Sequence, residues 1–118
     1  MLEEAFVARG AVALAAEASG GRLAGYLLGR VVADEGEVLS VAVDPALRRS
    51  GTGRRLLATA LDAMVAAGAG TVWLEVRASN LPARMMYLDS GFVVAGTRRG
   101  YYDQPVEDAL ILKRHLIA

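Results

Sequence analysis

The segment RRSGTGRR, residues 48–55, concentrates positive charge where a helix is expected to begin. It holds four arginines and two glycines, and no acidic residue lies between Asp44 and Asp62. The segment that follows, LLATALDAMVAAG, has the apolar spacing of an amphipathic helix. A helix N-terminus carries partial positive charge, so arginines there repel the helix end and one another. Glycines, arginines and helical N–H groups together are suited to phosphate, and we expect a ligand with several negative charges.

An arginine-rich turn in solvent is the alternative, at a penalty of roughly a few tenths of a kcal/mol. Two common phosphate motifs are excluded. The P-loop pattern GxxxxGK[ST] is absent, and GxGxxG fails because Leu56 stands where its third glycine would be. What remains is the pattern Arg48-x-x-Gly51-x-Gly53 after the strand-like segment SVAVDP.

Composition narrows the classes of function. The 118 residues suffice for one core, and we expect residues 1–118 to form a single domain. The 13 basic and 13 acidic residues balance, which argues against nucleic acid or an anionic membrane as the main partner. Twelve of the basic residues are arginine and one is lysine.

The reactive side chains are few. With no cysteine and one histidine, the sequence excludes disulfides and a thioester on the protein, and we expect neither a metal site nor a Ser-His-Asp triad. No apolar run reaches the about 18 residues of a membrane helix, and MLEEAF lacks a basic signal-peptide start. We therefore expect a cytoplasmic protein.

Apolar patterning predicts the elements that position the arginine segment. LEEAFVA (2–8) could form two turns of helix. The runs at 11–18, 22–33 and 38–44, separated by the turn signals SGG and DEGE, predict three strands of an antiparallel meander. A helix ending at Gly68 then leads into the strand TVWLEVR (71–77), so the strands before and after the helix should be parallel.

The rest of the chain predicts one more helix and two more strands. The helix runs from Asn80 through LPARMMYLDS to Gly91. Strands at 92–99 and 106–114 follow, joined by the loop GYYDQP. The predicted fold class is α+β, with a mixed, mostly antiparallel sheet, a central parallel βαβ pair and flanking helices.

The pattern Arg48-x-x-Gly51-x-Gly53 resembles the [QR]-x-x-G-x-[GA] pyrophosphate-binding motif of the GNAT superfamily of acetyl-CoA-dependent N-acetyltransferases. VAVDPALRRSGTGRRLL, WLEVRASN, MMYLDSGF and RRGYYDQPVEDALILKR have the order and spacing of its RimI-type ribosomal-protein-alanine N-acetyltransferases. The resemblance implies the GNAT fold. It also implies transfer of acetyl from acetyl-CoA to the α-amino group of a protein N-terminus, a ribosomal protein being one candidate, by direct attack in a ternary complex.

The resemblance assigns residues to the cofactor. The strand before the motif would offer its backbone to the pantetheine arm, the turn would hold the pyrophosphate, and an asparagine would contact coenzyme A. The residues concerned are Val41, Ala42, Val43, Arg48, Arg49, Ser50, Gly51, Thr52, Gly53, Arg54 and Asn80. Their alternative roles are plain core strand for the first three and helix capping for Asn80.

The resemblance also assigns the chemistry. Glu75 stands at the family's general-base position and Tyr87 at its general-acid position. Their alternative roles are a glutamate on a wet sheet face, paired with Arg77, and ordinary helix packing. A phenol with a pKa near 10 cannot fully protonate a thiolate with a pKa of about 8.5, so Tyr87 would mainly hydrogen-bond the leaving sulfur unless its pKa is lowered. Tyr101 and Tyr102 resemble the tyrosine pair that lines the peptide groove; a surface aromatic cluster is the alternative.

The sequence departs from the family at its start. RimI-type proteins usually begin with a strand and a helix-loop-helix, of which LEEAF alone could be a remnant; a start codon assigned too late would explain the same difference. The segment 11–18 would then be an uncovered sheet edge, and we expect a homodimer to cover it.

Other functions stay open. A GNAT protein could acetylate a small amine or a lysine side chain instead, or only bind acetyl-CoA with little catalysis. The loop GYYDQPVED favours peptides, and the presence of both Glu75 and Tyr87 favours an enzyme.

Overall fold

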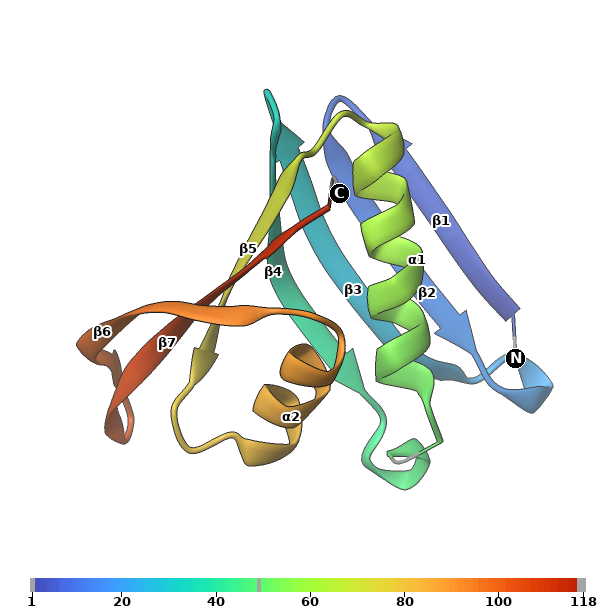
Figure 1. Cartoon of the computed structure of the whole chain (residues 1–118). Helices are drawn as coiled ribbons and strands as arrows, with labels where there is room; N and C mark the ends of the chain where they lie inside the picture. Colours follow the sequence, from blue (N-terminus) through green and yellow to red (C-terminus); the bar gives the residue numbers. More distant parts are fainter. Residues whose placement is uncertain (1, 49, 117–118) are drawn as a thin grey trace.

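The computed structural model describes residues 2–48 and 50–116, and these form one sheet with two helices on it (Figure 1). The seven strands lie in the order β1-β2-β3-β4-β5-β7-β6. The strands are β1 (Leu2–Ala8), β2 (Ala11–Glu17), β3 (Leu23–Val32), β4 (Glu35–Val43), β5 (Thr71–Arg77), β6 (Val93–Asp103) and β7 (Val106–His115). The helices are α1 (Thr52–Ala66), α2 (Leu81–Asp89) and the short 3₁₀ turns η1 (Ser19–Gly21) and η2 (Pro45–Leu47).

The sheet has the predicted mixed character. β4 and β5 are parallel, and all the other neighbouring strands are antiparallel. α1 connects the two parallel strands, as the apolar pattern of the sequence predicts. The predicted fold class, α+β with a central parallel pair, is therefore confirmed.

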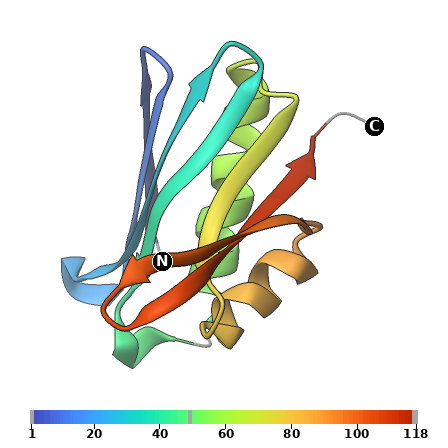
Figure 2. The same ribbon diagram turned by 90° about the vertical axis from the view of Figure 1, so that its left-hand side faces the viewer.

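The core lies between the sheet and the helices, which occupy one side of it (Figure 2). The helical stripe of α1 is fully buried at Leu56, Leu57, Ala60 and Met64. The buried residues of β5 alternate with partly exposed ones, because successive side chains of a strand point to opposite faces. Neither helix of the described residues has the length and apolar content to cross a membrane.

The parallel pair is short. β4 and β5 are in register only from Glu35 opposite Thr71 to Val38 opposite Leu74, although both strands continue further. A bulge at Leu39 coincides with this point, because Leu28 pairs with Ser40 while Gly29 pairs with Val38. A bulge bends its strand, and Figure 1 shows β4 and β5 close together at one end and far apart at the other.

The helix predicted for LEEAFVA is wrong: these residues form β1. The strand pairs along its whole length with β2, from Leu2 opposite Glu17 to Ala8 opposite Ala11. Arg9 and Gly10 close the hairpin with left-handed backbone at both positions, as such two-residue turns require. Pairing with a neighbouring strand has outweighed the helical preference of Leu, Glu and Ala.

The predicted open edge at residues 11–18 is wrong for the same reason. β2 lies between β1 and β3, so both of its edges are paired. The homodimer expected to cover this edge therefore loses its premise.

The C-terminal hairpin is longer than predicted. β6 continues through GYYD to Asp103, and β7 begins at Val106. The predicted loop GYYDQP is therefore mostly strand. The extra residues fit because the ladder shifts between Arg98 and Tyr102, where β6 bulges against β7.

Gly29 lets the bulged part of β4 and the helix α1 approach each other closely. A Cβ atom at Gly29 would lie 2.6 Å from Met64 Cε and 2.8 Å from the carbonyl oxygen of Glu37. We expect Gly29→Ala to lower the free energy of unfolding by about 1–3 kcal/mol, because backbone must move to admit the methyl group. Urea denaturation measures this.

Gly96→Ala is the matched control, since its Cβ would meet Ile111 Cδ1 at an ordinary 3.7 Å. Equal effects of the two substitutions would contradict the close approach at Gly29.

Candidate functional site

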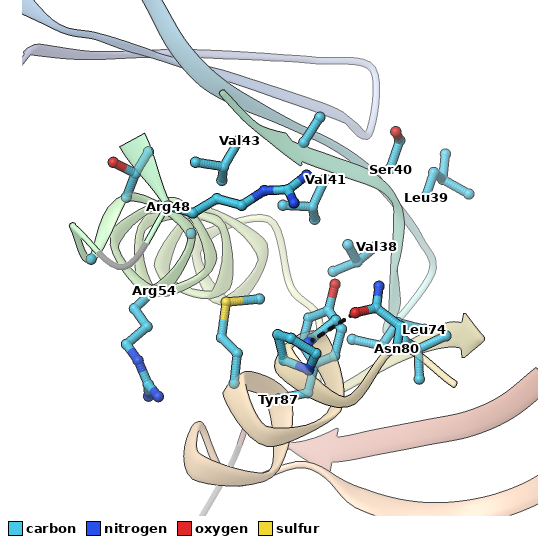
Figure 3. A pocket seen from close by; sticks show the side chains of 18 of the residues that line it. Val38, Leu39, Ser40, Val41, Val43, Arg48, Arg54, Leu74, Asn80 and Tyr87 are labelled. Atoms are coloured by element: carbon cyan, nitrogen blue, oxygen red, sulfur yellow. Dashed lines mark hydrogen bonds between the residues drawn. The ribbon is translucent and has the colours of Figure 1, made fainter. Parts of the chain in front are cut away.

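The separation of β4 from β5 opens a pocket of about 830 Å³ on the helical side of the sheet. Both strands, the turn before α1 and the helix α2 line it (Figure 3). Among the sequence-predicted site residues, those that line it are Val41, Ala42, Val43, Arg48, Gly51, Thr52, Gly53, Arg54, Glu75, Asn80 and Tyr87. Arg49 lies outside the described residues, and Ser50, Tyr101 and Tyr102 do not line this pocket.

The turn before α1 has the features of an anion site. Gly51 is the N-cap residue in left-handed conformation, and neither an acidic residue nor a capping side chain is present at this helix end in the described chain. The first N–H groups of a helix have no carbonyl partner within the helix. The Ser50 hydroxyl instead braces the turn, donating to the Leu47 carbonyl and lying 2.9 Å from Thr52 Oγ1.

The two arginines that border this pocket, Arg48 and Arg54, extend in different directions. Arg48 extends across the pocket toward Val41, whereas Arg54 points away from it (Figure 3). Arg54 donates to Asp89 Oδ2 of α2 at 2.8 Å. The side chain of Arg48 is therefore directed into the pocket, whereas Arg54 links α1 to α2 through its hydrogen bond to Asp89.

Gly53 and Asn80 have structural roles beside any ligand contact. A Cβ atom at Gly53 would lie 3.0 Å from Met86 Sδ, so glycine allows α1 and α2 to meet here. The Asn80 side chain accepts from Ala83 N at 3.3 Å and caps α2. The alternative role considered for Asn80 is thus present, and the residue also borders the pocket.

Glu75 lies on the face of β5 that points away from the helices. Val72, Leu74 and Val76 are buried on the other face, so the side chains of β5 alternate between the two sides of the sheet. The expectation that Glu75 pairs with Arg77 is wrong, because Glu75 Oε1 lies 3.1 Å from Arg98 Nε of β6. Arg77 instead lies 3.7 Å from Glu107 Oε2 and 4.0 Å above the centre of the Tyr102 ring.

Tyr87 projects from α2 into the pocket (Figure 3) and is buried, with 7% of its surface exposed. Its ring packs edge-to-face on Phe92 at 5.8 Å. Burial, and to a lesser extent the neighbouring Tyr102, raise the pKa of Tyr87. A lowered pKa, the condition for a strong general acid, is therefore not met. The phenol is neutral at physiological pH and can donate a hydrogen bond.

A second pocket, of about 570 Å³, lies at the same gap on the opposite face of the sheet. Tyr101 and Tyr102 line it with their rings edge-to-face at 5.2 Å, and Trp73 lies beside them under Lys113, whose Nζ is 5.6 Å from the ring centre. Four residues border both pockets: Val38, Leu39, Leu74 and Glu75. The two pockets therefore meet where the strands part.

Three residues that contribute to this site were given no site role from the sequence. Arg98, Leu39 and Trp73 all line the second pocket. Trp73 stands two residues before Glu75 in β5, so strand alternation places it on the same face. Leu39 depends on the bulge, and Arg98 reaches Glu75 across β7, so neither has a local sequence signal.

A mixed sheet with a central parallel pair, and an arginine-rich helix end without a side-chain cap, are the features that the motif Arg48-x-x-Gly51-x-Gly53 led us to expect. Residues 2–92 match the model of the acetyltransferase (GNAT) family. The chain belongs to this family.

Its relatives include ribosomal protein bS18-alanine N-acetyltransferase of Salmonella typhimurium, 44% identical over 93 residues that cover 77% of this chain and 63% of the relative. The crystal structure of the ribosomal-protein-S18-alanine N-acetyltransferase from Escherichia coli is 37% identical, with a TM-score of 0.80 over 92% of this chain and 69% of that one. Nourseothricin acetyltransferase is 29% identical, with a TM-score of 0.85 over 92% and 67% of the two chains. The chain thus spans less than two thirds of the length of the Salmonella relative, 63%.

The raised pKa of Tyr87 predicts a pH dependence of stability. The unfolded chain releases the phenol proton at about pH 10 and the folded chain at higher pH, so the unfolded state binds fewer protons in this window. The free energy of unfolding should therefore fall as pH rises through it, and fall less steeply in Tyr87→Phe. Urea denaturation at several values between about pH 9 and about pH 11 measures this. Equal slopes would mean that the phenol ionises as readily in the folded protein.

Proposed function

We propose that the chain transfers an acetyl group from acetyl-CoA to the α-amino group of a protein N-terminus, in the cytoplasm. One observation carries the proposal: Glu75 borders both pockets, one of which ends at an anion-binding turn and the other at two tyrosines. The names of the relatives support a ribosomal protein as the acceptor.

The residues of the first pocket fit acetyl-CoA. Its phosphates would meet Arg48 and the N–H groups of residues 51–54, where the described helix end makes no side-chain cap. Past Val38 and Leu74 the facing edges of β4 and β5 no longer pair with each other. An extended chain with amide groups, such as pantetheine, matches the unpaired edge at Val41, Ala42 and Val43. Bound acetyl-CoA supplies a thioester carbonyl for attack by an amine.

Glu75, which borders both pockets, and Tyr87, which lines the first, would carry the catalytic roles. An α-ammonium group has a pKa of about 8 and must lose a proton before it can attack. The partly exposed carboxylate of Glu75 would accept this proton as general base, either directly or through a water molecule. Tyr87, a neutral phenol whose pKa is raised further by burial, would donate a hydrogen bond to the departing sulfur.

The second pocket would hold the acceptor. Tyr101 and Tyr102 offer aromatic faces and hydroxyl groups to a peptide backbone. A small amine is the second candidate acceptor, because nourseothricin acetyltransferase shares the fold at 29% identity. A panel of N-terminal peptides, lysine-containing peptides with blocked N-termini and small amines would decide between them by rate.

Binding of acetyl-CoA to the turn should depend on Arg48. We expect Arg48→Gln to weaken binding roughly tenfold or more, because a hydrogen bond to a charged group is lost. Desulfo-CoA, which keeps every phosphate group, should bind comparably to CoA. Titration calorimetry measures all of these.

Arg30→Gln is the control. Arg30 is an exposed arginine of β3, and its Nη2 atom lies 3.3 Å from Glu37 Oε1 of β4. No binding of acetyl-CoA by the folded wild-type chain would contradict the proposal.

Catalysis should depend on Glu75 without cofactor binding depending on it. We expect Glu75→Gln to lower kcat about a hundredfold or more, since the carboxamide cannot accept the proton. The Kd of acetyl-CoA should stay within about twofold of the wild-type value, because the phosphate contacts lie at the other end of the pocket. Steady-state kinetics and calorimetry supply the two numbers. A protein that binds acetyl-CoA tightly but turns over no acceptor would instead be a binding module.

A further inference from the structure

Arg98 makes an ion pair with the residue that borders both pockets. Its Nε lies 3.1 Å from Glu75 Oε1, and the side chains are 54% and 29% exposed. Arg98 also lines the second pocket. A cation therefore already lies against Glu75 on the side from which an acceptor would enter.

The shape of β6 places this cation. Arg98 is paired with Ala109 at the last regular position before the bulge, and pairing resumes at Tyr102 opposite Glu107. Gly100 N donates to Asp108 Oδ1 at 2.9 Å and fixes the bulge. The bulge turns Tyr101 so that its ring lies 5.4 Å from the Arg98 guanidinium. Arg98 is thus held between a carboxylate and an aromatic ring of the acceptor pocket.

The acceptor brings a second cation to the same carboxylate. An α-amino group is mostly protonated at neutral pH, so it arrives as an ammonium ion. Arg98 and this ammonium ion carry the same charge and would repel each other beside Glu75. The two cations therefore compete for Glu75.

We propose, on the basis of the proposed function, that Arg98 takes the place of the acceptor's ammonium group on Glu75 and is displaced when the acceptor binds. Arg98 is then a specificity-determining residue that weakens acceptor binding without taking part in the chemistry. An ion pair of this exposure contributes a factor of only about 1.4 to 5 to an equilibrium constant, so displacement is easy. After displacement, the guanidinium group can keep its cation–π contact with the neighbouring Tyr101 ring.

The variant that tests this proposal is Arg98→Gln, which removes the positive charge of the side chain and keeps most of its shape. With saturating acetyl-CoA and an N-terminal peptide as acceptor, Arg98→Gln should lower the acceptor KM by about 2- to 5-fold, with kcat changed less than KM. Arg98→Lys keeps a cation near Glu75 and should return KM toward the wild-type value. Arg99→Gln is the matched control: it makes the same change of net charge at the next, exposed residue and should leave KM unchanged.

Three outcomes would overturn the proposal. An unchanged or raised KM in Arg98→Gln means that Arg98 does not compete with the acceptor. A loss of kcat at constant KM means that Arg98 assists Glu75 during the reaction. An equal fall of KM in Arg99→Gln means a general charge effect.

Peptide binding to the CoA-loaded protein, measured by calorimetry, separates this proposal from the proposed function. Absence of turnover in the wild-type chain contradicts the function. The peptide Kd of Arg98→Gln relative to wild type still tests the displacement, and a Kd that does not fall contradicts it. An unchanged Kd for acetyl-CoA shows that the variant is folded.

Discussion

The end of pairing between β4 and β5 is the constraint on which the rest of the structure depends. The two strands are in register for four residue pairs and then diverge at the Leu39 bulge. Both strands continue beyond this point. The end of their pairing coincides with the pocket on one face of the sheet and the pocket on the other, which share four lining residues. The fold therefore places two pockets on opposite faces of the sheet at the point where β4 and β5 no longer pair.

The helix α1 serves the core and the site at once. One stripe of it, including Leu57 and Met64, is buried against the sheet, while its first turn carries arginines and no capping side chain. Those choices at the helix end are unfavourable in the absence of an anion. The tightly packed stripe offsets them, because tertiary packing outweighs the terminal charges in helix stability. The stability of α1 therefore comes from its buried stripe, and its N-terminal turn contributes little to it.

The sequence predicted the elements whose signals are local or periodic. The helix α1, the strand β5 and the parallel pair were all predicted from the apolar pattern. The structure of LEEAFVA was not predicted correctly, because these residues favour a helix locally and form a strand by pairing with β2. The Arg98–Glu75 pair was not legible either, since it requires the order β5-β7-β6 and a bulge that only the packed sheet defines. Nearby Arg77 looked like the natural partner, but Glu107 holds it.

The scarcity of lysine has a consequence for the chemistry of the protein surface. Thioesters acylate amines without any enzyme, whereas a guanidinium stays protonated and is not a nucleophile at neutral pH. Of the 13 basic residues one is lysine, and its ammonium group lies over the Trp73 ring. A chain built this way offers a reactive acyl donor few side chains of its own to modify. Amine-directed labels, for the same reason, would report on Lys113 and on little else among its side chains.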